Sequence, residues 1–286
     1  MTEPVVVADY ACQTGECPTW HPTERRLYWA DIPRGRMYFH DPATGKSEQV
    51  YQGDAVGGIA VQADGSLLLF QSRGVVRAWH HGRLEIIVDE IGAQHRSRFN
   101  DVAADPEGRV YAGTMPSPDH LGSLYLLDTR GSVREVVGGV GEANGSGFSL
   151  DLRTFYFTDT RARRIYAYDY ARATGDLTAR RSFAEVPEGD GVPDGLAIDE
   201  EGFVWSARWG AGSIVRLDPA GREAQRIHLP APKISSMAFG GPDMADLYVT
   251  SGGGDRRDED GPLAGALFRV RPGVRGGPVY LSRVCE

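Results

Sequence analysis

Two carboxylates and two carboxamides stand at corresponding places in a repeating sequence pattern: Glu16, Asn100, Asn144 and Asp194. Each lies at the start of a short run of small or apolar residues, and Gly57 and Ser236 hold the same place in two further copies. Buried polar side chains without partners are costly, and a divalent cation would remove that cost. The four residues therefore predict a cation site, provided that the fold brings them together.

The donor atoms of this set narrow the choice of cation. All four side chains offer oxygen and none offers an imidazole or a thiolate, which suits Ca²⁺, Mg²⁺ or Mn²⁺. Zn²⁺ and Fe²⁺ stay open as alternatives, because carboxylate oxygen also binds these ions. The alternative without a metal is a water-filled channel in which the polar side chains are hydrogen-bonded.

The elements that must position these residues repeat along the whole chain. Six copies begin near residues 16, 57, 100, 144, 194 and 236, so that the spacing is 41 to 50 residues. Each copy contains short runs rich in Val, Ile, Tyr and Phe that are bounded by Gly, Asp or Pro, which is typical of strands. Four strands in such a copy are typical of a propeller blade, so the sequence predicts an all-β, six-bladed β-propeller. A β-sandwich is the weaker alternative.

The two ends of the chain are expected to meet. The last copy has too few strands, whereas the segment from Pro4 to Tyr10 contains a strand-like run that belongs to no copy. We therefore expect the N-terminal strand to complete the last blade of a single domain over residues 1–286. All first strands of a propeller run the same way around the channel, so the polar residues should form a ring at one mouth. Cys12 and Cys285 are expected near the closure, as reduced thiols.

Composition excludes several classes of protein. The 286 residues carry 31 Lys and Arg against 39 Asp and Glu, a net charge of −8, which argues against a nucleic-acid partner. No apolar run approaches the length of a membrane span, and Met1 to Gln13 lack the basic residues that begin a signal peptide. We therefore expect a soluble, cytoplasmic protein with no membrane partner, as a monomer or weak homo-oligomer.

Six motifs occur in order along nearly the whole chain: Gly15-Glu16-Cys17-Pro18, Arg98-Phe99-Asn100-Asp101, Ala112-Gly113-Thr114-Met115, Asn144-Gly145, Pro193-Asp194-Gly195 and Phe239-Gly240-Gly241. Together they resemble the regucalcin/gluconolactonase (senescence marker protein) family. Two departures, Cys17 in place of Ser or Gly and the Gly-Ser-Gly-Phe run after Asn144, bear on the substrate more than on the metal.

The resemblance assigns roles to individual residues. It implies a six-bladed propeller with one divalent cation, Ca²⁺ or Zn²⁺ ahead of Mn²⁺, Mg²⁺ or Fe²⁺. The cation would be held by Glu16, Asn144 and Asp194. It also implies that Arg98 and Asn100 contact sugar hydroxyls. An alternative for Arg98 is a structural ion pair with Asp101 or Glu107.

The activity that the resemblance implies is metal-dependent hydrolysis of a small-molecule sugar lactone, a gluconolactone-like aldonolactone, to the aldonic acid. The cation would polarise the lactone carbonyl, and Asp194 is the candidate general base for the attacking water. Arg98 and Asn100 would fix the sugar ring. Two other functions stay open: a non-catalytic calcium-binding regulatory propeller, and hydrolysis of other esters or organophosphates at the same site.

Overall fold

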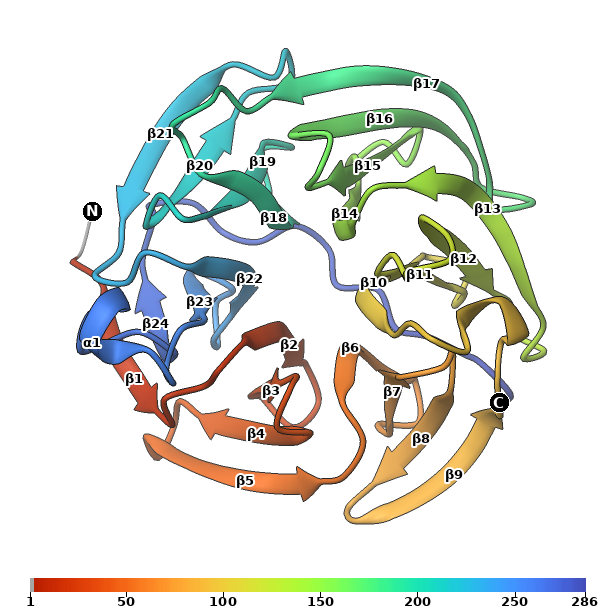
Figure 1. The fold of residues 1–286 in the computed structure, drawn as a ribbon, viewed down its shortest axis with the longest axis horizontal. Helices are drawn as coiled ribbons and strands as arrows, with labels where there is room; N and C mark the ends of the chain where they lie inside the picture. Colours follow the sequence, from red (N-terminus) through yellow and green to blue (C-terminus); the bar gives the residue numbers. More distant parts are fainter. Residues whose placement is uncertain (1–2) are drawn as a thin grey trace.

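Six four-stranded antiparallel sheets surround a central axis in the computed structural model, which describes residues 3–286 (Figure 1). The expected all-β, six-bladed propeller is confirmed, and so is the strand from the N-terminus that completes its last blade. Helix is confined to a 3-10 turn at Gly92–Gln94 and to α1 (Arg257–Asp260). Within residues 3–286, no helix has both the length and the apolar character needed to cross a bilayer.

The first three blades follow one another along the chain, each from its innermost to its outermost strand. Blade 1 consists of β2 (Gly15–His21), β3 (Arg26–Asp31), β4 (Arg36–Asp41) and β5 (Lys46–Gln52). Blade 2 consists of β6 (Val56–Val61), β7 (Leu67–Gln71), β8 (Val76–His80) and β9 (Arg83–Val88). Blade 3 consists of β10 (Phe99–Ala104), β11 (Val110–Thr114), β12 (Gly122–Leu127) and β13 (Val133–Val140).

The remaining blades keep this order until the last strand. Blade 4 consists of β14 (Ala143–Phe148), β15 (Thr154–Asp159), β16 (Arg164–Ala171) and β17 (Asp176–Glu185). Blade 5 consists of β18 (Val192–Ile198), β19 (Val204–Trp209), β20 (Ser213–Leu217) and β21 (Glu223–His228). Blade 6 consists of β22 (Ile234–Gly240), β23 (Asp246–Ser251), β24 (Ala266–Val270) and β1 (Val5–Asp9).

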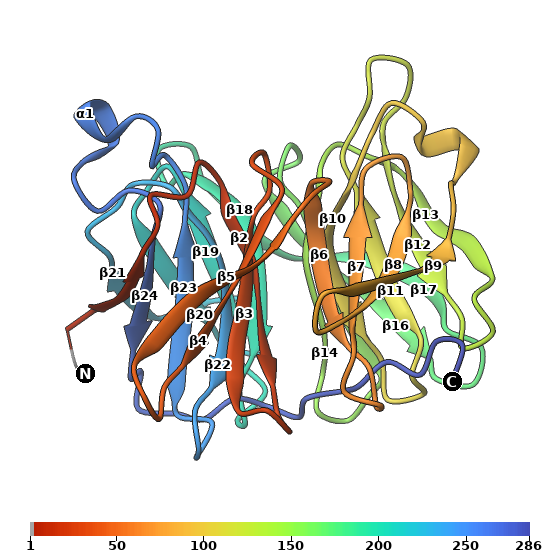
Figure 2. The ribbon, with the colours of Figure 1, turned by 90° about the horizontal axis from the view of Figure 1, so that it is seen from below.

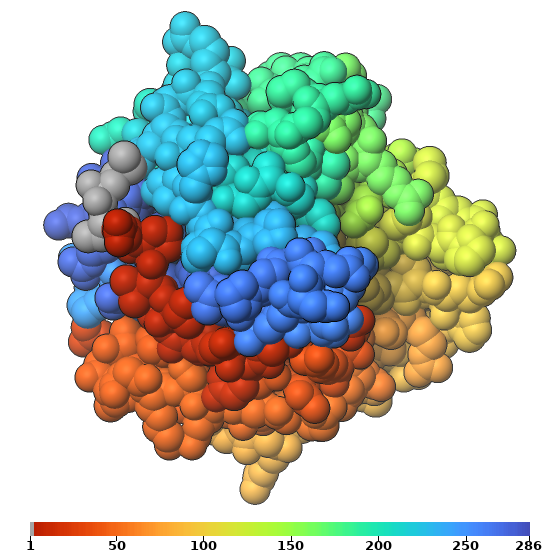
Figure 3. Space-filling model, turned by 60° about the vertical axis from the view of Figure 1, so that its left-hand side comes forward, coloured from red at the N-terminus to blue at the C-terminus, as the bar shows by residue number. Residues whose placement is uncertain are grey.

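The ring is closed by pairing between the two ends of the chain. β1 lies antiparallel to β24, with Val5 opposite Arg269 and Asp9 opposite Ala266. Arg257 of α1 also forms an ion pair with Asp9. In Figure 3 the N-terminal residues (red) lie on the surface against the blue atoms of the C-terminal part of the chain.

The distance of each strand from the axis explains its composition. Six first strands converge on the channel, so they are rich in small residues, as in the Val-Gly-Gly-Ile-Ala-Val sequence of β6, and are largely buried. The outermost strands face solvent and carry charged residues, as in β17. Charged side chains on such outer edges also discourage pairing with other chains.

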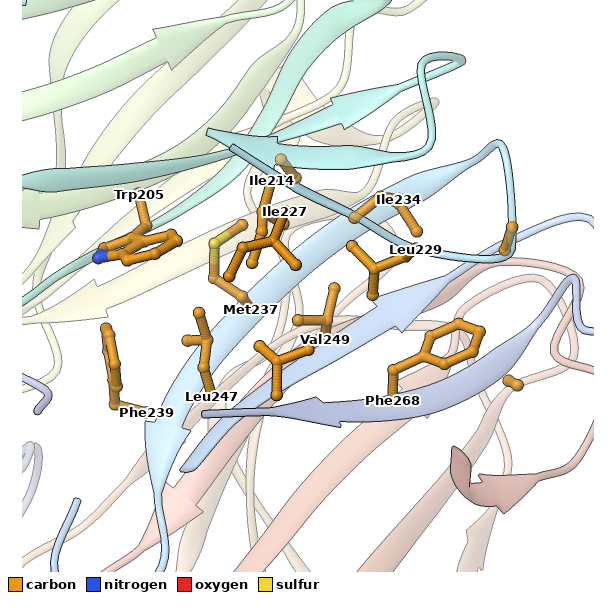
Figure 4. Packing of buried hydrophobic residues seen from close by; sticks show 14 residues of the cluster. Trp205, Ile214, Ile227, Leu229, Ile234, Met237, Phe239, Leu247, Val249 and Phe268 are labelled. Carbon is orange, nitrogen blue, oxygen red and sulfur yellow. The ribbon is translucent and has the colours of Figure 1, made fainter. Parts of the chain in front are cut away.

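Apolar side chains fill the space between neighbouring blades. Between blades 5 and 6, Trp205 and Ile214 of blade 5 share one apolar cluster with Met237, Leu247 and Phe268 of blade 6 (Figure 4). Each of these five side chains is at least 97% buried. Because every blade packs on both of its neighbours in this way, the ring holds the six first strands at fixed positions around the axis.

The last sixteen residues run in a direction that the sequence did not suggest. Residues 271–286 leave blade 6 and cross the end of the channel where the first strands finish (Figure 2). The Ser282 N–H donates to Val61 O at 2.8 Å, and the Cys285 N–H donates to Thr129 O at 2.9 Å, in blades 2 and 3. The expectation that Cys12 and Cys285 lie together is therefore wrong: Cys12 is buried, Cys285 is exposed at blade 3, and both are free thiols.

Candidate active site

A cavity of about 220 Å³ opens at the mouth of the channel where the first strands begin. It is lined by all five residues predicted for the site: Glu16, Arg98, Asn100, Asn144 and Asp194. Its other walls are Thr14, Glu142, Thr160, Val192 and Trp209. The structure thus brings the predicted residues together from four different blades, although their roles are still predictions.

A register shift lies at the ring position of each blade, and the ring side chains of blades 1, 3, 4 and 5 line the cavity. The pairing register shifts between Glu16 and Thr19 in blade 1 and between Ala143 and Ser146 in blade 4. Blade 5 repeats this shift between Pro193 and Leu196. Bulges commonly re-aim side chains next to functional sites. The repeated sequence revealed the ring positions, but it contained no direct signal for the bulges that orient them.

Cys17 occupies the bulge of blade 1 in a conformation that favours glycine, with φ at 44°. The buried Glu16 Oε2 accepts a 2.7 Å hydrogen bond from the Cys17 N–H. Burial raises the pKa of the Cys17 thiol well above its usual range, which opposes a thiolate. Cys17 is therefore a small core residue that shapes the loop beside Glu16.

Three buried carboxyl groups share the centre of the channel: Glu16, Asp101 and Asp194. Burial and then the neighbouring carboxylates raise the pKa of Glu16 and of Asp194 well above the usual range. Burial raises the pKa of Asp101 to about 7, against the effect of Arg98. Desolvation and like charge both disfavour the ionised forms, and a cation held by Glu16 and Asp194 would offset that cost.

A hydrogen-bonded chain joins the residues of blades 3, 4 and 5. Arg98 Nη1 donates to Asn100 Oδ1 at 2.6 Å, and Asn100 Nδ2 donates to Asn144 Oδ1 at 2.6 Å. Asn144 Nδ2 then donates to Thr160 Oγ1 at 2.7 Å, and the Thr160 hydroxyl donates to Pro193 O at 2.7 Å. Asn100 therefore positions Asn144. Of the two alternative partners of Arg98, Glu107 instead accepts from Arg172, whereas Asp101 lies close enough for the charge of Arg98 to lower its pKa.

The donor set fits a hard divalent cation. Two buried carboxylates and the carboxamide oxygen of Asn144, which keeps a second lone pair, converge on one cavity. These are the oxygen donors that Ca²⁺ and similar cations accept, with further positions left for water or substrate. Within residues 3–286, no group of three or more His, Cys, Asp or Glu side chains is placed to hold a metal ion, so Asn144 would be the necessary third donor.

Two aspartates that end second strands fix the backbone just before the ring. Asp31 accepts from the N–H groups of Gln13 and Thr14, both at 3.1 Å. Asp159 occupies the same place in blade 4 and accepts from the N–H groups of Gly141 and Glu142, at 3.1 and 3.2 Å. The identical spacing in the two blades shows that these aspartates set the entry of each first strand into the site.

Sequence reasoning missed Glu142 and Trp209 as walls of the cavity. Glu142 stands two residues before Asn144, just as Arg98 stands two residues before Asn100. Thr14 and Val192 occupy the same place before Glu16 and Asp194, and all four line the cavity. This repeat position was the available signal for Glu142. No repeat signal marked Trp209.

Beyond the ring residues, the channel continues toward the mouth where the first strands end. Cys17, Asp101, Gly145 and Ser236 line a small chamber of about 70 Å³. A chamber of about 230 Å³ follows, with mostly apolar walls such as Ile59, Val102 and Met237. Gly277 to Tyr280 of the C-terminal segment form its far wall. Polar chemistry is therefore concentrated at the mouth that holds Glu16 and Asp194.

Known proteins resemble this chain in sequence and in fold. Residues 14–253 match the SMP-30/Gluconolactonase/LRE-like region. The chain is 47% identical to the pentonolactonase XacC of Haloferax volcanii over 97% of both chains. It is 35% identical to a 6-deoxy-6-sulfogluconolactonase of Pseudomonas putida over 92% of both. A crystal structure of regucalcin from Agrobacterium tumefaciens, described as a calcium-binding protein, superposes with a TM-score of 0.90 at 27% identity, covering 98% of this chain and 97% of that one.

Proposed function

The chain belongs to the SMP-30/gluconolactonase/LRE-like family, and from this membership we propose that it hydrolyses a sugar lactone to the aldonic acid with the help of a bound divalent cation. The observation that carries the proposal is the convergence of Glu16, Asn144, Asp194 and Arg98 on one cavity. The names of two relatives, a pentonolactonase and a sulfogluconolactonase, support a lactone as the substrate.

Glu16, Asn144 and Asp194 would hold the cation. When bound, a divalent cation supplies Lewis-acid polarisation of the lactone carbonyl and stabilises the developing oxyanion. In the reaction, the oxygen of water adds to the carbonyl carbon, the bond from that carbon to the ring oxygen breaks, and the ring oxygen gains a proton. The products are a carboxylate and a free hydroxyl group.

Asp194 is the candidate base that takes the proton from the attacking water. Its carboxylate is buried in the cavity, and burial with neighbouring carboxylates raises its pKa well above the usual range. A bound cation would lower this pKa again, so the assignment of Asp194 as the base rests on the position of its carboxylate in the cavity. Arg98 lines the same cavity, where its guanidinium can donate to ring hydroxyls and fix the carbonyl carbon near Asp194.

Metal analysis combined with proton release tests the proposal. The purified protein would be analysed for divalent metals and then assayed with a panel of aldonolactones, before and after chelation. We expect one equivalent of metal, turnover of at least one lactone, loss of turnover on chelation and recovery on adding metal back.

Three outcomes would contradict parts of the proposal. Metal binding without turnover of any lactone would favour a calcium-binding regulatory propeller. Turnover of simple esters or organophosphates in place of lactones would keep the site but change its substrate. Turnover that survives complete removal of metal would exclude the cation from the reaction.

A further inference from the structure

We infer that Glu142 is a second sugar-binding residue, which accepts hydrogen bonds from substrate hydroxyls and selects neutral lactones over lactones that carry a negative charge. The inference rests on the proposed lactonase function and extends it to the class of lactone. It is carried by the position of Glu142 in the repeat, by its fixed backbone and by the charges that line the cavity.

The repeat places Glu142 beside Arg98 as its structural equivalent. Each residue stands two positions before a carboxamide of the ring, Arg98 at the start of blade 3 and Glu142 at the start of blade 4. The two carboxamides, Asn100 and Asn144, are hydrogen-bonded to each other at 2.6 Å. Arg98 and Glu142 thus both line the cavity just before the ring carboxamides. Arg98 can donate hydrogen bonds there and Glu142 can accept them.

The backbone of Glu142 is held rigidly, whereas its carboxylate is left for a ligand. Its N–H donates to Asp159 Oδ1 at 3.2 Å, and its carbonyl accepts from the Thr160 N–H at 3.1 Å. The carboxylate lies 3.7 Å from the guanidinium of Arg161, and its side chain is 27% exposed. Arg161 is 61% exposed, so solvent screens that pair. Rigid placement with remaining acceptor capacity is what a binding residue requires.

The charges of the cavity decide which ligand fits. Its walls carry three carboxylates, Glu16, Glu142 and Asp194, against the single guanidinium of Arg98. A divalent cation held by Glu16 and Asp194 would neutralise the charges of these two carboxylates. The negative charge of Glu142 would then remain with the positive charge of Arg98. A sugar hydroxyl can donate to Glu142 while another accepts from Arg98. A phosphate, sulfonate or carboxylate group offers only acceptors, so beside Glu142 it meets like charge.

Substituting Glu142 by Gln tests the inference, because Gln keeps the size of the side chain and removes its charge. The assay would compare kcat/KM for glucono-1,5-lactone and for 6-phosphoglucono-1,5-lactone. We expect the preference for the neutral lactone to fall about tenfold in Glu142→Gln, mostly through KM of the phosphorylated substrate. Raising the ionic strength should lower the preference of the native protein and leave that of the variant unchanged.

Two further variants separate charge from folding. Glu185→Gln changes the net charge equally, at an exposed glutamate that also pairs with an arginine but lies on the outer strand β17, so the preference should not change. Glu142→Asp keeps the charge and should largely keep the preference. An equal loss of kcat/KM for both lactones, or an unchanged preference in Glu142→Gln, would overturn the inference. Failure of the native protein to hydrolyse any lactone of the aldonolactone panel would instead count against the proposed function.

Discussion

At the scale of single residues, folding gathers Glu16, Asp101 and Asp194 around one axis and removes them from water. All three have pKa values raised above the ordinary carboxyl range, chiefly by burial. A raised pKa in the folded state means that the folded protein holds these protons more tightly than the unfolded chain does. Stability and protonation are therefore linked at these three side chains, and at Glu16 and Asp194 cation binding would be linked to both.

The first consequence concerns the dependence of stability on pH. A carboxyl group whose pKa is raised by folding contributes stability below its unfolded pKa and loses that contribution as pH rises through the folded pKa, about 7 for Asp101. In a chelator we therefore expect the Tm to fall by about 3 °C or more between pH 5 and pH 8.

A divalent cation should oppose this loss, because it favours the ionised carboxylates. Asp101→Asn should flatten the pH dependence of the chelated protein. Differential scanning fluorimetry from pH 5 to pH 8, with and without the cation, measures the Tm of the native protein and of Asp101→Asn. A Tm of the chelated protein that rises toward pH 8 would contradict the linkage.

Asp194→Ala removes both a carboxylate of the ring and the candidate base. We expect turnover to fall at least about a hundredfold, the range of a lost general base, and divalent metal to bind more weakly in isothermal titration calorimetry. Without metal the variant should be no less stable than the native protein, because one buried like charge is gone. Asp89→Ala, at an exposed position directly after β9, is the matched control. Full turnover with metal still bound would rule out both roles of Asp194.

At the scale of strands, the site depends on how closely neighbouring blades approach. Gly145 follows Asn144 in the bulge of β14, and a methyl group there would overlap the backbone N of Leu196 and lie 2.8 Å from Gly195 Cα. To make room for this methyl group, the backbone at Gly195 and Leu196 would have to shift. Asp194 directly precedes Gly195 and would move with it. The distance between Asn144 and Asp194 is thus set by the absence of one side chain.

Gly145→Ala should therefore disturb the site and the interface between blades 4 and 5 together. We expect a loss of about 1–3 kcal/mol in the free energy of unfolding, typical of overpacking, with a large fall in metal affinity and turnover. Gly92→Ala is the control, since nothing lies within 4 Å of a methyl group at that position. Urea unfolding and metal titration of both variants provide the measurement. A fully active Gly145→Ala protein would show that the blades can move apart without harm.

Strand patterns explain why much of this architecture could be predicted. Six copies of alternating apolar runs and turn residues define the blades, and a first-strand position that repeats polar residues defines the ring, as seen for Glu16 and Asp194. The bulges could not be predicted, because they depend on register between strands rather than on residue type. The path of residues 271–286 was also missed, since Pro- and Gly-rich segments carry no strand pattern. Glu142 was missed because only the ring position itself was compared between copies.

At the scale of the whole molecule, the ring is held closed in two places. β1 joins β24 by main-chain hydrogen bonds at the circumference. Residues 271–286 bridge the opposite mouth, where Gln62 Nε2 donates to Val284 O at 2.9 Å and the Gly277 N–H donates to Ile198 O at 2.9 Å. Blades 2 and 5, which are not neighbours, are thereby connected across the axis.

Removing β1 should open the ring at its circumference. We expect a variant without residues 3–8 to lose about 5 °C or more in Tm. In this variant β24 loses its partner strand and becomes the solvent-exposed edge of blade 6. A variant without residues 3 and 4, which lie outside the strand, is the control and should keep the native Tm. Thermal unfolding followed by circular dichroism decides between these outcomes. Equal Tm values for both variants would show that the pairing adds no stability.

The pairing of β1 with β24 also has a consequence during translation. β1 precedes all of blades 1 to 5 in the chain, whereas its partner strand, β24, follows all of them. Blades 1 to 5 can form in order of synthesis, but β1 has no partner strand until β24 of blade 6 has been synthesised. A nascent chain halted before residue 266 therefore carries an unpaired β1, and the ring of blades closes only after β24 has been synthesised.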